Sequence, residues 1–168
     1  MLAPGAVIAD RFELVAQAGA GGMGEVWRAR DRASGVEVAL KVVRQLGAAD
    51  LVRFEREADV LERLAHPGIA RHVAHGRGRE GPFLAMEWVE GSSLARALRE
   101  RAPSVDETLA LARALAPALA CAHDAGVVHR DLKPANVLLR GGDFAAPLLI
   151  DFGVARLAQA PSELTSAG

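Results

Sequence analysis

The sequence has little cysteine and no long uninterrupted apolar stretch, the features that indicate disulfide bonds, cysteine-ligated zinc or membrane-spanning helices. Its single cysteine, Cys121, excludes an internal disulfide and a zinc site built from cysteines, and it suits a reducing compartment. The longest apolar stretch, residues 109–122, is interrupted by Arg113 and Pro117, so it predicts a buried helix and no membrane segment. A net charge of −1 provides no general electrostatic argument for nucleic acid as a partner.

The remaining composition is that of a folded, globular chain. With 168 residues, of which 51% are hydrophobic and 24% charged, the chain is not wholly disordered, and its length fits one domain or a little more. The first residues lack an early positive charge and reach the charged pair Asp10–Arg11 too soon for a secretion signal. We therefore expect a cytoplasmic protein.

Lysine and asparagine are scarce, and their positions are informative. Of 20 cationic residues only Lys41 and Lys133 are lysines, and Asn136 is the only asparagine. Lysine is a compact point charge that suits a phosphate, whereas arginine is a wide planar fork. Lysines retained against this arginine-rich background indicate specific roles.

Hydrophobic periodicity divides the chain into a strand-rich front half and a helix-led back half. The predicted strands are residues 12–15, 25–30, 36–43, 69–75, 82–89, 127–128, 137–139 and 148–150. Apolar residues at three- and four-residue steps predict a helix that Asp50 caps and that ends at His66-Pro67-Gly68. After a boundary at residues 90–93, a capping box at Ser104 opens a longer helix that ends at Gly126. The predicted fold class is α+β.

A glycine cluster lies between the first two predicted strands. It fits the pattern G-x-G-x-x-G-x-V with Gly19, Gly21, Gly24 and Val26. Glycine allows the backbone to approach a phosphate closely and to present N–H donors. A plain tight turn explains the same pattern, and the strand that follows excludes a dinucleotide-binding βαβ unit.

Other polar side chains suit phosphate and metal chemistry. Lys41 lies in an apolar strand, where a buried ammonium group needs an anionic partner. Asp131, Lys133 and Asn136 fall within six residues, and Asp151 begins an Asp-Phe-Gly sequence fifteen residues later. The aspartate can accept a proton, the lysine can meet a phosphate, and the amide oxygen of asparagine can bind Mg²⁺.

In this order, the motifs resemble the signature set of Hanks-type protein kinases, and most closely the bacterial serine/threonine branch. The resemblance covers residues from about 11 to the end. It implies a protein-kinase-like fold with an antiparallel β-sheet N-lobe, one helix, and the start of a mainly helical C-lobe. It also implies ATP and Mg²⁺ as cofactors, and a protein Ser/Thr hydroxyl as the acceptor. The implied segments are an N-terminal extension (1–10), the N-lobe with the hinge (11–89), and a partial C-lobe ending within the activation segment (90–168).

The resemblance further implies a role for each motif residue. Asp131 would be the catalytic base, and Lys133 would steady the γ-phosphate. Lys41, paired with Glu57, would hold the α- and β-phosphates. Asn136 and Asp151 would hold Mg²⁺. The implied nucleotide contacts are Gly19, Ala20, Gly21, Gly22, Met23, Gly24, Val26, Ala39, Lys41, Met86, Glu87, Val89, Glu90 and Leu138.

An end within the activation segment leaves two interpretations open. The chain is a fragment of an active protein serine/threonine kinase, or it is a catalytically incompetent, nucleotide-binding or pseudokinase-like remnant that acts as an interaction module. Apolar residues on most sides of the long helix would then allow self-association. Candidate phosphorylation sites are Ser162, Thr165 and Ser166, and Arg130 would clasp the phosphate. A small-molecule kinase of the aminoglycoside type is a third possibility, and the Asp-Leu-Lys-Pro-Ala-Asn sequence argues against it.

Four histidines complete the set of candidate ligands. His66, His72, His75 and His123 show no metal-ligand spacing, so we expect them to be structural or solvent-facing. His72 also departs from the family, because the resemblance implies a larger apolar residue there, in a column with Leu61, His129 and Phe152.

Overall fold

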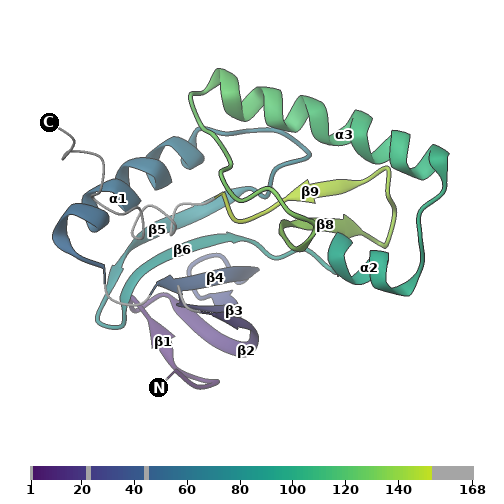
Figure 1. The fold of residues 1–168 in the computed structure, drawn as a ribbon. Helices are drawn as coiled ribbons and strands as arrows, with labels where there is room; N and C mark the ends of the chain where they lie inside the picture. Colours follow the sequence, from purple (N-terminus) through teal and green to yellow (C-terminus); the bar gives the residue numbers. More distant parts are fainter. Residues whose placement is uncertain (1, 22–23, 44–45, 153–168) are drawn as a thin grey trace, which may run out of the picture.

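The computed structural model describes residues 2–21, 24–43 and 46–152. Figure 1 shows a curled sheet at the N-terminal end of the chain, with helix α1 beside strand β5 and helix α3 above strands β8 and β9. The strands are β1 Val7–Ile8, β2 Phe12–Gly21, β3 Gly24–Asp31, β4 Glu37–Val43, β5 His72–Gly78, β6 Gly81–Glu87, β7 Gly91–Ser93, β8 Val137–Arg140 and β9 Pro147–Leu149. The helices are α1 Ala48–Glu62, α2 Leu94–Glu100, α3 Val105–Asp124 and the short 3-10 helix η1 Pro134–Asn136. The predicted α+β class is confirmed.

The larger sheet contains six antiparallel strands in the order β1-β2-β3-β4-β6-β5. Its first strand lies inside the segment expected to be an extension, where Ile8 pairs with Phe12 and is fully buried. Ala9 and Asp10 connect the two strands with positive φ angles of 50° and 56°. Two consecutive residues of this kind form the tight turn that matches the twist of a hairpin. The sheet therefore begins at Val7.

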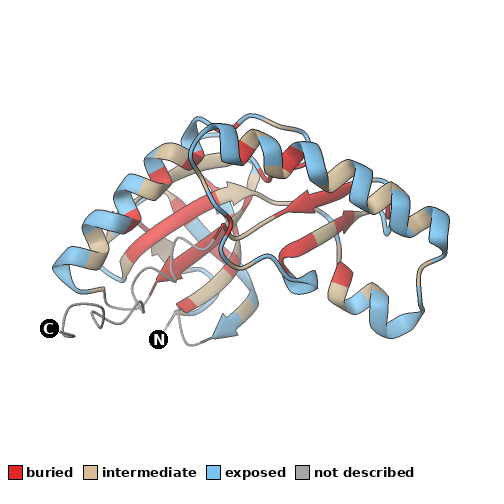
Figure 2. Cartoon of the chain, turned by 45° about the horizontal axis from the view of Figure 1, so that its top comes forward, coloured by how far each residue is buried: buried red, intermediate tan, exposed pale blue. Residues whose placement is uncertain are grey.

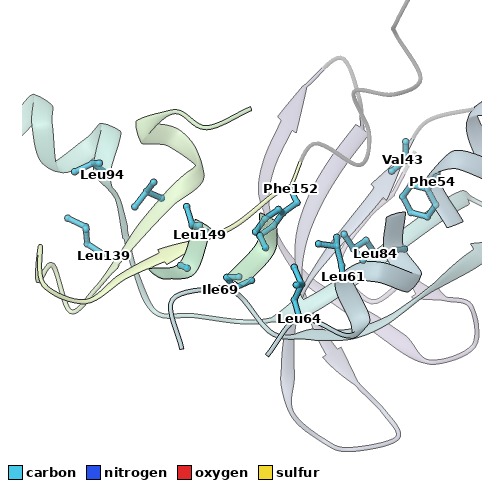
Figure 3. Close-up of a cluster of buried hydrophobic side chains, with 14 of the residues drawn as sticks. Val43, Phe54, Leu61, Leu64, Ile69, Leu84, Leu94, Leu139, Leu149 and Phe152 are labelled. Carbon is cyan, nitrogen blue, oxygen red and sulfur yellow. The ribbon is translucent and has the colours of Figure 1, made fainter. Parts of the chain in front are cut away.

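Side chains alternate across this sheet and build a separate core on each face. On β4, Val38, Leu40 and Val42 are buried on one face with aromatic residues of other strands. Lys41 and Val43 point to the opposite face, where α1 packs. This second core continues beyond the sheet and joins both halves of the chain, as Figure 3 shows for its labelled side chains. Those labelled are Val43, Phe54, Leu61, Leu64, Ile69, Leu84, Leu94, Leu139, Leu149 and Phe152.

Helix α1 depends on this second core. It buries Phe54, Ala58 and Leu61, which recur at three- and four-residue steps. The prediction that Asp50 caps the helix is wrong. The N-cap is Gly47, which has no side chain to cap the helix, and Asp50 lies in the first turn. A carboxylate in that turn is stabilised by the positive end of the helix dipole.

Helix α3 begins as predicted and buries much less. The Ser104 hydroxyl accepts a hydrogen bond from the Glu107 backbone at 3.1 Å, and the Glu107 carboxylate accepts one from the Ser104 backbone at 2.8 Å. The helix continues through Pro117 to Asp124. Only two alanines, Ala118 and Ala122, are fully buried, and Figure 2 shows exposed residues along most of its length.

The back half contains a small sheet in the order β7-β8-β9. Gly141 and Gly142 form the predicted turn after β8, both with positive φ angles. The apolar run at residues 127–128 forms no strand, so that prediction is wrong. Within the described residues, every helix is too short or too polar to cross a lipid bilayer.

Candidate active site

A cavity of about 370 Å³ lies between the larger sheet and the back half of the chain. Its lining residues are Ala18, Gly19, Val26, Ala39, Lys41, Ala70, Met86, Glu87, Trp88, Val89, Gly91, Asn136, Leu138, Ile150 and Asp151. Most of these were predicted from sequence, although they come from separate stretches of the chain between residues 18 and 151. Five lining residues were not predicted from sequence: Ala18, Ala70, Trp88, Gly91 and Ile150. These are mostly small or apolar residues without a motif, and only the position of Trp88 between two predicted contacts could have indicated it.

The predicted glycine loop separates into two kinds of glycine. Gly24 has a φ angle of 141°, and a Cβ atom there would lie 2.1 Å from the backbone oxygen of Val42. Only glycine fits that position, because the neighbouring strand is too close. A Cβ atom at Gly19 or Gly21 would meet nothing within 4 Å. Of these two, Gly19 lines the cavity, and the space open beside it is what a bound phosphate requires.

Not every predicted nucleotide contact lines the cavity. Ala20, Gly21 and Gly24 belong to the hairpin but are not part of the lining. Glu90 is exposed and accepts a hydrogen bond of 3.0 Å from the indole of Trp88. The structure therefore does not bring Glu90 to the cavity. The predicted contacts Gly22 and Met23 lie outside the described residues.

Lys41 is 8% exposed, and its ammonium group forms an ion pair with the carboxylate of Asp151. The two residues are 110 positions apart in sequence. Asp151 adopts a φ angle of 56°, a left-handed conformation that is uncommon for residues other than glycine and is concentrated at functional sites. The buried lysine therefore has the anionic partner that its environment requires, and that partner is the predicted metal ligand.

Glu57 has a different partner from the one expected. The resemblance implies a pair with Lys41, but Glu57 Oε1 accepts a hydrogen bond of 3.0 Å from Arg130 Nη1. Burial raises the pKa of Glu57 above its ordinary value, and the positive charge of Arg130 only partly opposes this. Arg130 was also predicted to clasp a phosphate on Ser162, Thr165 or Ser166, which lie outside the described residues. The ion pair between Glu57 and Arg130 connects α1 with the loop before β8, and the sequence did not predict it.

The loop before β8 is held together by its own polar side chains. Lys133 Nζ donates to the carboxylate of Asp131 at 2.7 Å, and Asn136 Nδ2 donates to the same carboxylate oxygen at 3.0 Å. Asn136 Nδ2 also donates to the backbone oxygen of Asp131 at 2.8 Å. These bonds orient the Asp131 carboxylate. Asn136 and Asp151, which both line the cavity, contribute the hard oxygen donors that Mg²⁺ prefers.

The predicted column of side chains is only partly formed. The rings of His129 and Phe152 lie 4.7 Å apart between centroids, and Phe152 shares its core with Leu61. His129 Nε2 lies 3.1 Å from the backbone oxygen of Ile150. His72, however, has a polar partner, because its Nε2 lies 2.9 Å from Nδ1 of His75.

The curled antiparallel sheet, its single helix and the cleft below it define a protein-kinase-like fold. The chain belongs to the protein kinase family, since the family model described as the protein kinase domain matches residues 12–167. It falls within the Hanks-type bacterial serine/threonine branch.

Named relatives and solved structures agree with this assignment. The chain is 43% identical to the serine/threonine-protein kinase PkaA of Streptomyces coelicolor, over 92% of this chain and 31% of the relative. It is 40% identical to the serine/threonine-protein kinase pkn2 of Myxococcus xanthus, over 95% of this chain and 20% of the relative. The crystal structure of the Mycobacterium tuberculosis PknI kinase domain matches with a TM-score of 0.81 and 35% identity, covering 92% of this chain and 62% of that structure. The chain thus spans a third or less of the length of these curated relatives.

Proposed function

We propose that this protein transfers the γ-phosphoryl group of Mg²⁺-ATP to a serine or threonine hydroxyl of another protein. The observation that carries the proposal is the composition of the cavity between the two halves. Gly19, Lys41, Asn136 and Asp151 all line it, and they supply a phosphate-accessible backbone, a cation and two metal-type oxygen donors. The relatives named as serine/threonine kinases support the same activity, and the requirement for ATP is our reason for proposing that it acts in the cytoplasm.

The chain's own groups can perform the transfer by positioning and charge neutralisation. Lys41 would bind the phosphates, and Asp131, oriented by Lys133 and Asn136, would accept the proton of the substrate hydroxyl. The hydroxyl oxygen then forms a bond to the γ-phosphorus. The bond from that phosphorus to the oxygen that bridges to the β-phosphate breaks, and ADP leaves.

The donor set fits a hard divalent cation. Asn136 and Asp151 present an amide and a carboxylate at the same cavity, which is the ligand chemistry of Mg²⁺. When bound, the metal supplies positive charge that neutralises the phosphate oxygens. Asp151 also pairs with Lys41, so a bound metal and the lysine would share one carboxylate.

A second function, nucleotide binding without transfer, has a specific observation in its favour. Glu57 pairs with Arg130, so it is not the partner of Lys41 that catalysis in this family uses. The chain as described would then bind nucleotide and act as an interaction module. Self-association through exposed apolar residues of α3 such as Leu109 belongs to this alternative and stays a prediction.

Calorimetry of Mg²⁺-ATP binding tests the shared part of both functions. We expect saturable binding to the 168-residue chain, and loss of that binding in Lys41→Met and in Asp151→Asn. Arg30→Met is the matched control, because it removes a cation from an exposed position on the neighbouring strand β3. Equal binding by the control and by Lys41→Met would contradict a nucleotide site at this cavity.

A transfer assay separates the two functions. Radiolabelled ATP is supplied with a generic protein acceptor, and the Asp131→Asn variant reports background incorporation. Incorporation that depends on Asp131 supports the kinase. Nucleotide binding without Asp131-dependent incorporation supports the binding module, and incorporation into an aminoglycoside instead of protein would contradict the proposed acceptor class.

A further inference from the structure

Away from the cavity, the fold brings together three metal-ligating side chains from α1 and β5. The ligand atoms of Asp59, Glu62 and His75 all lie within 4.8 Å of one another. Nε2 of His75 is 3.2 Å from Oδ1 of Asp59. The histidines show no ligand spacing in sequence, and this group forms only where the helix and the strand meet in the folded chain.

An irregularity in β5 orients the histidine of this group. Residues three apart in a regular strand point to opposite faces of the sheet. The pairing of β5 with β6 shifts register between His72 and Ala74, which is a bulge. As a result His72 and His75 lie side by side, with ring centroids 5.1 Å apart and Nε2 of His72 2.9 Å from Nδ1 of His75.

The contact between the two histidines is compatible with the tautomer that a metal site needs. In that tautomer, Nδ1 of His75 carries the proton and donates it to His72, and Nε2 of His75 presents its lone pair on the side of Asp59. Histidines that bind metals usually donate their other ring N–H to a neighbouring acceptor, which sets the tautomer and the ring orientation. His72 is well placed for that supporting role.

The distances also suit a small cation. Ligand atoms of a tetrahedral zinc site, with bonds of about 2.0–2.1 Å, lie about 3.4 Å apart. The separation of 3.2 Å between His75 and Asp59 is close to that value. Asp59 has a 60% exposed side chain, so its carboxylate can rotate without disturbing the core, and Glu62 is also exposed.

We propose that Asp59, Glu62 and His75 bind a divalent transition-metal ion, best matched by zinc, that fastens the C-terminal part of α1 to β5. One imidazole and two carboxylates suit zinc, and they leave the fourth position to water. Mg²⁺, which prefers oxygen ligands and octahedral geometry, fits this set poorly. The site is separate from the cavity that Asn136 and Asp151 line, and it lies on the same helix as Glu57.

Calorimetric titration of the metal-free 168-residue chain with zinc chloride, in the absence of nucleotide, tests the proposal. We expect one saturable site, and affinity at least ~100-fold weaker in His75→Gln. Asp59→Asn and Glu62→Gln change only exposed carboxylates, so their weaker binding would not reflect misfolding. His123→Gln is the matched control because His123 is an exposed histidine outside the group, and it should bind zinc like the unmodified chain. His72→Gln, which removes a positioning residue, should weaken binding by about 10–100-fold.

A second measurement reports the ligand geometry directly. Cobalt(II) added to the metal-free chain should give the visible absorption of a tetrahedral site, and zinc but not excess Mg²⁺ should abolish it. Absence of saturable zinc binding would overturn the proposal. So would unchanged affinity in both Asp59→Asn and Glu62→Gln, because zinc would then be held by histidines alone and would not connect α1 to β5.

Discussion

Helices α1 and α3 are stabilised in different ways. Helix α3 has a complete capping box and a bidentate pair between Arg101 and Glu107, yet it fully buries only two alanines. Helix α1 lacks a side-chain cap and buries Phe54, Ala58 and Leu61. The start of α3 is therefore specified by residues close in sequence, whereas α1 is specified by contacts with the sheet. Glu57 and two of the three proposed zinc ligands, Asp59 and Glu62, are on α1, the helix whose position depends on tertiary contacts.

The largest difference between the two helices should appear in the free energy of unfolding when an apolar residue on each is truncated. Phe54→Ala removes a side chain that is 1% exposed and leaves a cavity in the core that joins the two halves. We expect the free energy of unfolding to fall by about 3–5 kcal/mol, measured by urea denaturation.

Leu109→Ala is the matched change on α3. Leu109 is 46% exposed, so we expect a loss of no more than ~0.5 kcal/mol. Similar losses at both positions would contradict the distinction between the helices, because they would mean that the exposed side of α3 is covered in solution.

The capping box provides the next largest effect. Ser104→Ala removes the hydroxyl that accepts from the Glu107 backbone, and it should lower the free energy of unfolding by about 1 kcal/mol. Ser92→Ala, in strand β7, is the control and should change it by less than ~0.5 kcal/mol. Thermal unfolding followed by circular dichroism measures both, and equal values would show that the cap contributes nothing specific.

Helix α1 should gain stability from the cap that it lacks. Gly47 has φ −63° and ψ 161°, and a Cβ atom there would meet only a carboxylate oxygen of Asp50 at 3.5 Å. Gly47→Ser should therefore raise the free energy of unfolding by about 0.5 kcal/mol. Gly24→Ser should have the opposite sign, because its Cβ would collide with the backbone of Val42. A destabilised Gly47→Ser chain would contradict this account of the start of α1.

The smallest expected effect is a difference in pH dependence. Arg101 lowers the pKa of Glu107 on α3 to about 2, so its stabilisation is present above its ordinary pKa of 4.5 and is lost as the pH falls toward 2. Burial raises the pKa of Glu57 on α1, so its contribution is fully present below 4.5 and is lost as the pH rises through the raised pKa.

Urea denaturation across a pH series tests the two signs. Glu107→Gln should flatten the acid side of the stability profile, and Glu57→Gln should flatten the decline above pH 4.5. Changes of the same sign in both variants would contradict the opposite environments of the two carboxylates.

Local patterns predicted much of the fold correctly. Alternation identified β3, and the Ser-x-x-Glu sequence at Ser104 located the start of α3, because both signals are determined by residues near one another in sequence. The same kind of reasoning misplaced the start of α1 at Asp50, since that helix takes its limits from packing. It also missed β1, which is too short for a periodic signal.

Pairings between distant residues could not be predicted in this way. Motifs identified Lys41, Glu57 and Asp151 as members of one site, but the choice of partner depends on how far α1 lies from the strand that carries Lys41. Arg130 pairs with Glu57 across 73 positions, and no pattern in either segment encodes that contact. The proximity of His75 to Asp59 likewise depends on a bulge that the sequence of β5 does not reveal.

Because lysine is scarce, chemical labelling of amines can be assigned to single residues, one of which, Lys41, lines the cleft. Only Lys41, Lys133 and the terminal amine can react with an amine-selective reagent. The Lys133 side chain is 49% exposed, whereas that of Lys41 is 10% exposed and ion-paired with Asp151. Lys133 should therefore be modified first. Because no other lysine contributes, mass spectrometry of the single peptide that contains Lys41 measures how often its contact with Asp151 opens.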